Sequence, residues 1–308
     1  MGELDLNIKW RKIQSLKEEK GYRALRITPE CLPDLFVAID SDVNRCILLN
    51  FPKGANLRTK GSDRDKLKLV YLPNSGMIYI KLKDSNFNQL FNDFILSIYS
   101  EINLVSDSEK AALLFIEIFY KWSNFFEKSN SRTLTDEQIQ DLFGELFALN
   151  SQIKKSNYST INNTLNSWKG PYDFVNDFEY ELKNIQVKTK IHSNDYVKIL
   201  NEYELEKELN KDLELFLVSI RIDLVKGRSL KDLLIEVIKQ TKIHSGDLLI
   251  LYKAINYSGI TINNLEQYDN YRFVATKTEI FDAGNYGFPK LSTSNISDKI
   301  SNLRYELK

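Results

Sequence analysis

Residues 168–192 bring together side chains that could carry out hydrolytic chemistry. Acidic residues alternate with aromatic or apolar ones over 177–183, and Gln186 and Lys188 belong to a second alternation over 185–191. A period of two is typical of strands with one buried face, so this stretch predicts a hairpin of two strands. Side chains two positions apart on a strand project to the same side, which places Gln186 and Lys188 together.

Such a hairpin is suited to hold a cation beside a phosphate. A hard divalent cation such as Mg²⁺ takes oxygen ligands, usually one or two carboxylates, with water and substrate phosphate completing the shell. Asp177 can supply a carboxylate and Gln186 a neutral amide oxygen. Lys188 can hold or help deprotonate a water, or neutralise charge that develops on the phosphate. Three nearby carboxylates are alternatives to Asp177 as the ligand: Asp173, Glu179 and Glu181.

A helix upstream of the hairpin can bring a further carboxylate to it. Thr135-Asp-Glu-Gln138 is a capping box, which predicts that a helix begins at Thr135. Apolar residues follow at helical spacing over 139–149, and Glu145 falls at the edge of that stripe. Periodicity alone leaves two interpretations of Glu145: an ordinary surface glutamate, or a carboxylate that reaches the strand on which the helix packs.

The segments after the hairpin predict an α/β arrangement. The stretch 213–225 is too long and apolar for an edge strand, so it is expected at the centre of the sheet. Ser229 is expected to cap a helix. Further predicted elements are a helix over 245–257 and strands over 198–200, 271–281 and 303–307. Four glutamates are interpreted as a solvated helix or loop face: Glu202, Glu204, Glu206 and Glu208.

The N-terminal part has a different pattern. A short amphipathic helix is predicted within residues 1–20, and five short strands joined by tight turns are predicted between residues 22 and 83. Two long helices with apolar and aromatic stripes follow, over 88–102 and 108–127. Their helical period indicates core packing rather than base stacking.

Composition limits the expected partners and compartment. The 308 residues carry 42 Lys and Arg against 42 Asp and Glu, so the chain lacks the basic field that most nucleic-acid-binding proteins carry. Positive charge gathers in residues 53–68, interpreted either as a phosphate-contacting flap or as a solvated loop. The candidate DNA contacts are Lys53, Arg58, Lys60, Arg64 and Lys190. Cys31 and Cys46 lack metal-ligand spacing, and no apolar run is long enough to span a membrane, so a cytoplasmic protein is expected.

Four motifs, in their order and spacing, resemble a bacterial family of PD-(D/E)XK motif proteins found near restriction and phage-defence genes. The motifs are Asp-Leu-Phe-Gly-Glu-Leu-Phe at 141–147, Trp168-x-Gly-Pro171, Asp177-Phe178 and Val187-Lys188-Thr189. The resemblance implies an α+β or α/β fold. A β-rich module over 1–105 would precede a restriction-endonuclease-like core over 106–308, with a mixed central sheet flanked by helices.

The resemblance also implies an activity. It implies a Mg²⁺-dependent, type II restriction-like endonuclease that hydrolyses phosphodiester bonds of double-stranded DNA and leaves a 5′-phosphate, with Mn²⁺ able to substitute. Asp177, Gln186 and Glu145 would hold the metal, Glu145 taking the place of the family's helix glutamate. Lys188 would position the water or stabilise developing charge. The expected partners are a second copy in a homodimer and a companion methyltransferase or other defence proteins. No membrane partner is expected.

Gln186 departs from the family pattern, which usually has Glu at this position. One negative charge is therefore missing, and this supports an alternative: a DNA-recognition subunit with a degenerate nuclease site. A third interpretation is a structural scaffold in a defence complex, indicated by the zero net charge and by aromatic residues expected on the surface: Tyr252, Tyr257, Tyr268 and Tyr271. His192 is interpreted as structural.

Overall fold

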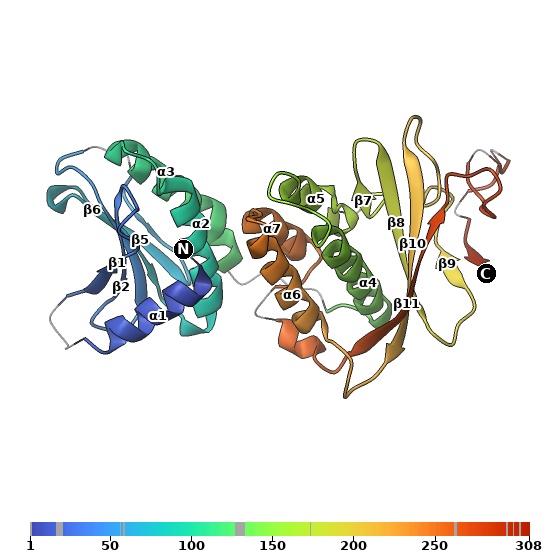
Figure 1. The fold of residues 1–308 in the computed structure, drawn as a ribbon, viewed down its shortest axis with the longest axis horizontal. Coiled ribbons are helices and arrows are strands. Elements are labelled where there is room, and N and C mark those ends of the chain that lie inside the picture. The colour runs from blue at the N-terminus through green and yellow to red at the C-terminus, as the bar shows by residue number, and fades with distance from the viewer. Residues whose placement is uncertain are drawn as a thin grey trace. The chain divides into compact units, whose positions relative to one another are not determined.

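The chain forms two compact units, Met1–Ser129 and Asn130–Lys308. The computed structural model describes residues 2–16, 21–55, 57, 59–126, 133–172, 174–261, 264–293, 295–297, 299–301 and 303–308. Each unit has its own sheet and its own helices (Figure 1). The division falls later than the boundary predicted after residue 105, because the helix at 108–123 packs on the helix before it and so belongs to the first unit.

An antiparallel six-stranded sheet forms the first unit, in the order β1-β2-β3-β6-β5-β4. Its strands are β1 (Arg23–Arg26), β2 (Asp34–Ile39), β3 (Arg45–Asn50), β4 (Ser62–Asp63), β5 (Leu67–Leu72) and β6 (Met77–Leu82). The five strands predicted between residues 22 and 83 are confirmed, and β4 is an additional short one. The turn from β2 to β3 contains Val43 and the turn from β5 to β6 contains Gly76, both with φ of 64°.

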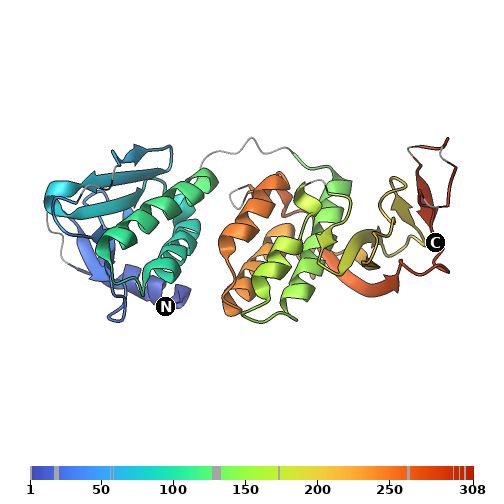
Figure 2. The ribbon, with the colours of Figure 1, turned by 90° about the horizontal axis from the view of Figure 1, so that it is seen from above.

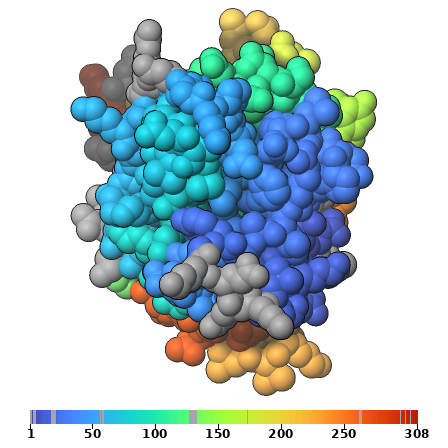
Figure 3. Space-filling view, turned by 90° about the vertical axis from the view of Figure 1, so that its left-hand side faces the viewer, coloured from blue at the N-terminus to red at the C-terminus, as the bar shows by residue number. Residues whose placement is uncertain are grey.

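Helices α1 (Glu3–Gln14), α2 (Asn88–Ile102) and α3 (Ser108–Ser123) pack together in this unit. Trp10 of α1 donates its indole N–H to Asn92 of α2, at 2.8 Å. The rings of Phe94 and Trp122 lie 5.8 Å apart, so the aromatic stripes form core, as their helical period predicts. Figure 3 shows the strand side of this unit, where residues coloured blue to cyan form the surface.

The first unit also contains both cysteines. Cys31 and Cys46 are buried free thiols. Burial raises the pKa of the Cys46 thiol to about 12, so this residue behaves as a small apolar core side chain.

A four-stranded mixed sheet forms the second unit, in the order β11-β10-β8-β7, with β8 parallel to β10 and the other pairs antiparallel. The strands are β7 (Phe178–Glu179), β8 (Lys183–Ile191), β10 (Asp212–Ile222) and β11 (Phe273–Asp282), with a separate pair of β9 (Val197–Ile199) and β12 (Tyr305–Leu307). The helices are α4 (Asp136–Ile153), α5 (Ile161–Ser167), α6 (Leu230–Ile243) and α7 (Leu248–Tyr257).

The helices of the second unit lie on one side of the four-stranded sheet, and the β9–β12 pair lies on the other (Figures 1 and 2). β10 occupies the interior of the sheet, as its apolar length predicts. A mixed central sheet flanked by helices is the expected α+β fold. None of the helices in the described part of the chain has both the length and the apolar character needed to cross a membrane.

Helix α4 packs closely on β8. A Cβ on Gly144 would lie only 1.9 Å from Thr189 Oγ1 and 3.2 Å from Thr189 Cβ. Glycine is therefore required for this separation of helix and strand. The close approach brings Glu145, the next residue of α4, to the level of the hairpin.

The predicted hairpin is present, but its first strand is much shorter than expected. β7 covers only Phe178–Glu179, whereas the alternation predicts a strand as far as residue 183. The Tyr180 N–H donates to the Lys183 carbonyl at 2.8 Å and closes a turn. β8 therefore begins at Lys183, two residues before the predicted start at 185.

Candidate active site

Asp177 lies directly before β7 and faces β8. Phe178 pairs with Ile185 in the antiparallel ladder, so continuing the register by one position sets Asp177 opposite Gln186. The Asp177 Oδ2 atom accepts a hydrogen bond from the Val187 N–H at 2.7 Å. Opposed residues of an antiparallel pair project to the same face. The loop and the strand therefore present a carboxylate and an amide side by side.

The motif Trp168-x-Gly-Pro171 holds a second carboxylate against the first. Trp168 is 1% exposed, and its indole N–H donates to Glu145 Oε2 at 2.8 Å. A Cβ on Gly170 would lie 2.2 Å from Glu145 Oε2 and 3.0 Å from Asp177 Oδ1. The carboxylates of Glu145 and Asp177 thus flank a single point, and the missing side chain at position 170 leaves room for both.

Backbone hydrogen bonds fix the loop that carries this glycine. The amides of Lys169 and Gly170 both donate to the carbonyl oxygen of Asp177, at 2.7 and 3.1 Å. Trp168 also forms an isolated antiparallel bridge with Phe178. The loop is therefore tied to the start of β7, which keeps Gly170 next to the two carboxylates.

Burial makes it unfavourable for both carboxylates to be ionised at once. Burial raises the pKa of Glu145 well above its usual range and the Asp177 charge raises it further, while the Trp168 N–H opposes the shift. Burial also raises the pKa of Asp177 to about 7, against the opposing effects of the Val187 N–H and of Lys188. A divalent cation between them would favour the ionised form of both.

Gln186 adds a buried amide oxygen to the site. Its side chain is 6% exposed, and its Oε1 atom has no hydrogen-bond partner among the residues that the structure describes. A buried acceptor without a partner is unfavourable by about 1–3 kcal/mol. Coordination to a cation would satisfy it.

The donor set fits a hard divalent cation with oxygen ligands. Two carboxylates and one amide oxygen are the ligand types that Mg²⁺ and Mn²⁺ prefer. Within the described ranges, no three or more His, Cys, Asp or Glu side chains gather in a cluster that could hold a metal ion. The amide of Gln186 would therefore act as the third protein ligand beside Glu145 and Asp177.

Lys188 lies at the same site and is paired. Its Nζ atom is 2.5 Å from Glu204 Oε2, and the two side chains are 13% and 9% exposed. Lys188 also favours the ionised form of Asp177, which places its charge within electrostatic reach of the carboxylates. An ammonium held in this way contributes positive charge and N–H donors.

Residues 6–308 match the family model described as "Putative PD-(D/E)XK family member, (DUF4420)". The chain belongs to this family. The PD-(D/E)XK superfamily comprises nucleases and related phosphodiesterases, which generally use divalent metals such as Mg²⁺. No curated protein and no solved structure matches the chain.

In this DUF4420 protein the solvated role predicted for the acidic stretch after β9 holds for the exposed Glu208 but is wrong for Glu202 and Glu204. Glu202 and Glu204 are 4% and 7% exposed, and Glu204 contacts Lys188. The sequence gives no local signal for this ion pair, because alternating glutamates are equally typical of an exposed loop. Only the folded structure shows that Glu204 contacts Lys188 of β8.

The alternative ligands for Asp177 lie elsewhere or outside the described residues. Glu179 is half-buried on β7 and Glu181 is exposed in the turn that follows. Asp173 falls outside the described residues. Of the three described carboxylates, Asp177 is the one that the structure brings beside Glu145 at Gly170.

The candidate DNA contacts are divided between the two units. Lys53 and Lys60 are exposed and Arg64 is half-buried in the first unit, whereas Lys190 is half-buried on β8. Arg58 falls outside the described residues. Part of the basic stretch is neutralised locally, since Lys66 pairs with Asp84 at 3.1 Å and Lys68 with Asp63 at 3.3 Å.

Two of the four tyrosines expected on the surface for a scaffold are buried. Tyr252 and Tyr268 are 3% and 2% exposed, so that prediction is wrong for both. Tyr252 is a buried residue of α7, and the Tyr268 hydroxyl accepts a hydrogen bond from the Leu134 N–H at 3.1 Å. Tyr257 is exposed and Tyr271 is half-buried. His192 contacts Thr276 of β11, with Nδ1 and Oγ1 3.0 Å apart.

Proposed function

We propose that this protein is a metal-dependent endonuclease that hydrolyses phosphodiester bonds of double-stranded DNA. The observation that carries the proposal is the convergence of Glu145 and Asp177 at Gly170. Gln186, whose Oε1 atom has no hydrogen-bond partner among the described residues, falls opposite Asp177 when the β7–β8 register is continued by one position. Membership of a PD-(D/E)XK family supports the same chemistry. Mg²⁺ is the proposed cofactor, and Mn²⁺ would substitute because it takes the same oxygen donors.

Glu145, Asp177 and Gln186 would hold the cation. When bound, Mg²⁺ supplies a Lewis acid that polarises the scissile phosphate and lowers the pKa of an attacking water. The Val187 N–H donates to one oxygen of Asp177, and the Trp168 indole N–H donates to one oxygen of Glu145. These hydrogen bonds fix the orientation of both ligands. Such pre-organisation typically decides metal affinity as strongly as ligand identity does.

Lys188 acts through its charge in this proposal. Its ammonium is paired with Glu204 at 2.5 Å. It would donate hydrogen bonds to the water or to a phosphate oxygen and offset the negative charge that develops during hydrolysis. The products would be a 5′-phosphate and a 3′-hydroxyl.

A cleavage assay tests the proposal. Plasmid and phage genomic DNA would be incubated with wild-type protein in Mg²⁺, Mn²⁺ or EDTA, beside the Asp177→Ala/Lys188→Ala variant. We expect metal-dependent products from wild type only. Equal cutting by both proteins, or cutting in EDTA, would refute the assigned site.

Gln186 favours one second candidate, a DNA-recognition subunit that does not cleave. The usual family residue at this position is Glu, so the site has one carboxylate fewer than its relatives. A gel shift with intact DNA binding, together with no cleavage by wild type in any metal, would favour this candidate.

We further propose a role in restriction or anti-phage defence in the bacterial cytoplasm, with a homodimer and a companion methyltransferase or other defence proteins as partners. The support for this role is the resemblance of the motifs to a family found beside such genes. Phage plating on cells that express wild type or Asp177→Ala tests it. Equal plating efficiencies on both strains would contradict the role.

A further inference from the structure

We propose that Glu204 is a positioning residue that holds Lys188 in the active site. The inference rests on the proposed nuclease function and adds to it a residue outside the motifs of the family. Glu204 lies in the β9–β10 loop, residues 200–211. Its observed partner is the ammonium of Lys188.

The ion pair is short and shielded. Nζ of Lys188 and Oε2 of Glu204 are 2.5 Å apart, with side-chain exposures of 13% and 9%. The other oxygen of Glu204 accepts a hydrogen bond from the Leu200 N–H at 3.2 Å and from the Asn201 amide at 3.5 Å. One oxygen is thus held by the loop and the other by the lysine, so Glu204 fixes the end of a side chain that otherwise has four freely rotating bonds.

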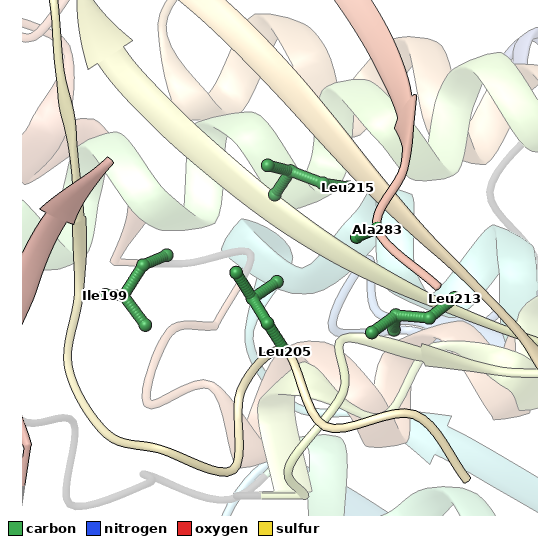
Figure 4. Packing of buried hydrophobic residues seen from close by; sticks show 5 residues of the cluster. All are labelled: Ile199, Leu205, Leu213, Leu215 and Ala283. Carbon is green, nitrogen blue, oxygen red and sulfur yellow. The ribbon is translucent and has the colours of Figure 1, made fainter. Parts of the chain in front are cut away.

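The loop itself is anchored, which a positioning role requires. Leu205, next to Glu204, is fully buried in a cluster with Ile199, Leu213, Leu215 and Ala283. Figure 4 shows the Leu205 side chain directed between Ile199 and the leucines of β10. Partly buried Phe288, Tyr305 and Leu307 of the C-terminal segment pack against the same cluster.

The neighbouring glutamates fix the same loop on both sides of Glu204. Glu202 accepts from the Leu303 N–H at 3.0 Å and Glu206 from the Thr293 N–H at 2.8 Å. Glu208 accepts from the Asn184 amide at the start of β8, at 2.8 Å. These contacts tie the loop to the C-terminal segment and to the strand that carries Lys188, so the carboxylate of Glu204 has a defined place.

The test compares Glu204→Gln with wild type in single-turnover cleavage and in Mn²⁺ binding. Glutamine keeps the size and the acceptor for the Leu200 N–H but removes the charge that holds Lys188. We expect kcat to fall about 10- to 100-fold with KM for DNA little changed, and Mn²⁺ affinity to stay within about twofold of wild type. Glu204→Asp keeps the charge and should recover part of the rate.

A double-mutant cycle shows whether Glu204 acts through Lys188. Glu204→Gln should have no further effect on the rate in a Lys188→Ala background. That double variant also removes both buried charges, so it should fold even if Glu204→Gln alone unfolds. Glu214→Gln is the matched control, because it breaks another ion pair made by a lysine of β8, that of Lys183 with Glu214 of β10, and should leave the rate unchanged.

Each outcome decides the proposal. An unchanged or higher kcat in Glu204→Gln would overturn it, and so would additive losses in the cycle. A parallel loss of Mn²⁺ affinity would overturn it in favour of Glu204 as a metal ligand. Absence of metal-dependent cleavage by wild type overturns the nuclease function together with this role, whereas cleavage by wild type and variant alike overturns the role alone.

Discussion

Gly170→Ala should separate the two carboxylates without disturbing the fold around them. The new Cβ would lie 2.2 Å from Glu145 Oε2, 2.8 Å from Glu145 Cδ and 3.0 Å from Asp177 Oδ1. Real Cβ contacts are essentially never shorter than 3.0 Å, so the Glu145 carboxylate must move by about 1 Å. The φ of Gly170 is outside the left-handed region, so alanine adds no backbone strain.

The size of the effect follows from this displacement. A misplacement of about 1 Å can lower a catalytic rate about 100-fold, and disturbed ligand orientation typically weakens metal binding about 10- to 100-fold. Overpacking should lower the free energy of unfolding by about 1–3 kcal/mol. We therefore expect weak metal binding and slow cleavage in a protein that still unfolds cooperatively.

The assay would combine a Mn²⁺ titration, single-turnover cleavage and thermal unfolding. Gly287→Ala is the matched control, since a Cβ there meets only Asn285 Oδ1, at an ordinary 3.5 Å. Wild-type metal affinity and cleavage in Gly170→Ala would refute the convergence of Glu145 and Asp177 as the metal site.

Three further predictions concern the ligands and their surroundings. Gln186→Glu restores a carboxylate to the site, so the Mg²⁺ concentration for half-maximal cleavage should fall about tenfold, a change of about 1.4 kcal/mol in binding. An unchanged or higher Mg²⁺ concentration would count against Gln186 as a ligand. Trp168 is the one tryptophan of the second unit, so its fluorescence should change when Mn²⁺ binds. Trp168→Phe should abolish this fluorescence change and weaken Mn²⁺ binding about tenfold by calorimetry. A fluorescence change that persists in this variant would contradict the contact with Glu145. The pKa of Asp177 is raised to about 7 in the folded protein, so the metal-free fold binds more protons than the unfolded chain and should lose stability as pH rises from about 4 to about 7. Asp177 contributes at most about 4 kcal/mol to this loss. Asp177→Asn should therefore stabilise the metal-free protein in denaturant at pH 8 but not at pH 4, and equal effects at both values would contradict this.

Periodicity predicts most of the elements because it reflects local burial. The stripe of α2 predicts its observed bounds, Asn88–Ile102, and the capping box at Thr135 predicts the start of α4. Periodicity fails where a turn interrupts an alternation. Residues 180 and 182 continue the pattern of β7, yet the hydrogen bond from Tyr180 to Lys183 closes the turn earlier.

The candidate site is only partly visible in the sequence. Strand alternation predicts that Gln186 and Lys188 project to one side, but it leaves Asp177 as one of several candidate carboxylates. Glu145 needs the family resemblance, because its position at the edge of a stripe is equally typical of a surface residue. Glu204 cannot be found in this way, since its partner lies 16 positions away on another element. The sequence does not predict that α3 belongs to the first unit for a similar reason, because an apolar stripe does not indicate which domain the helix packs against.

The most direct test of the central claim is a calorimetric titration of Mn²⁺ into the metal-free protein. The claim is that Glu145 and Asp177, with Gln186, form one cation site. We predict a single site in wild type, and loss of that site in both Glu145→Ala and Asp177→Ala, each still folded by circular dichroism. Binding of wild-type strength in either variant would contradict the claim.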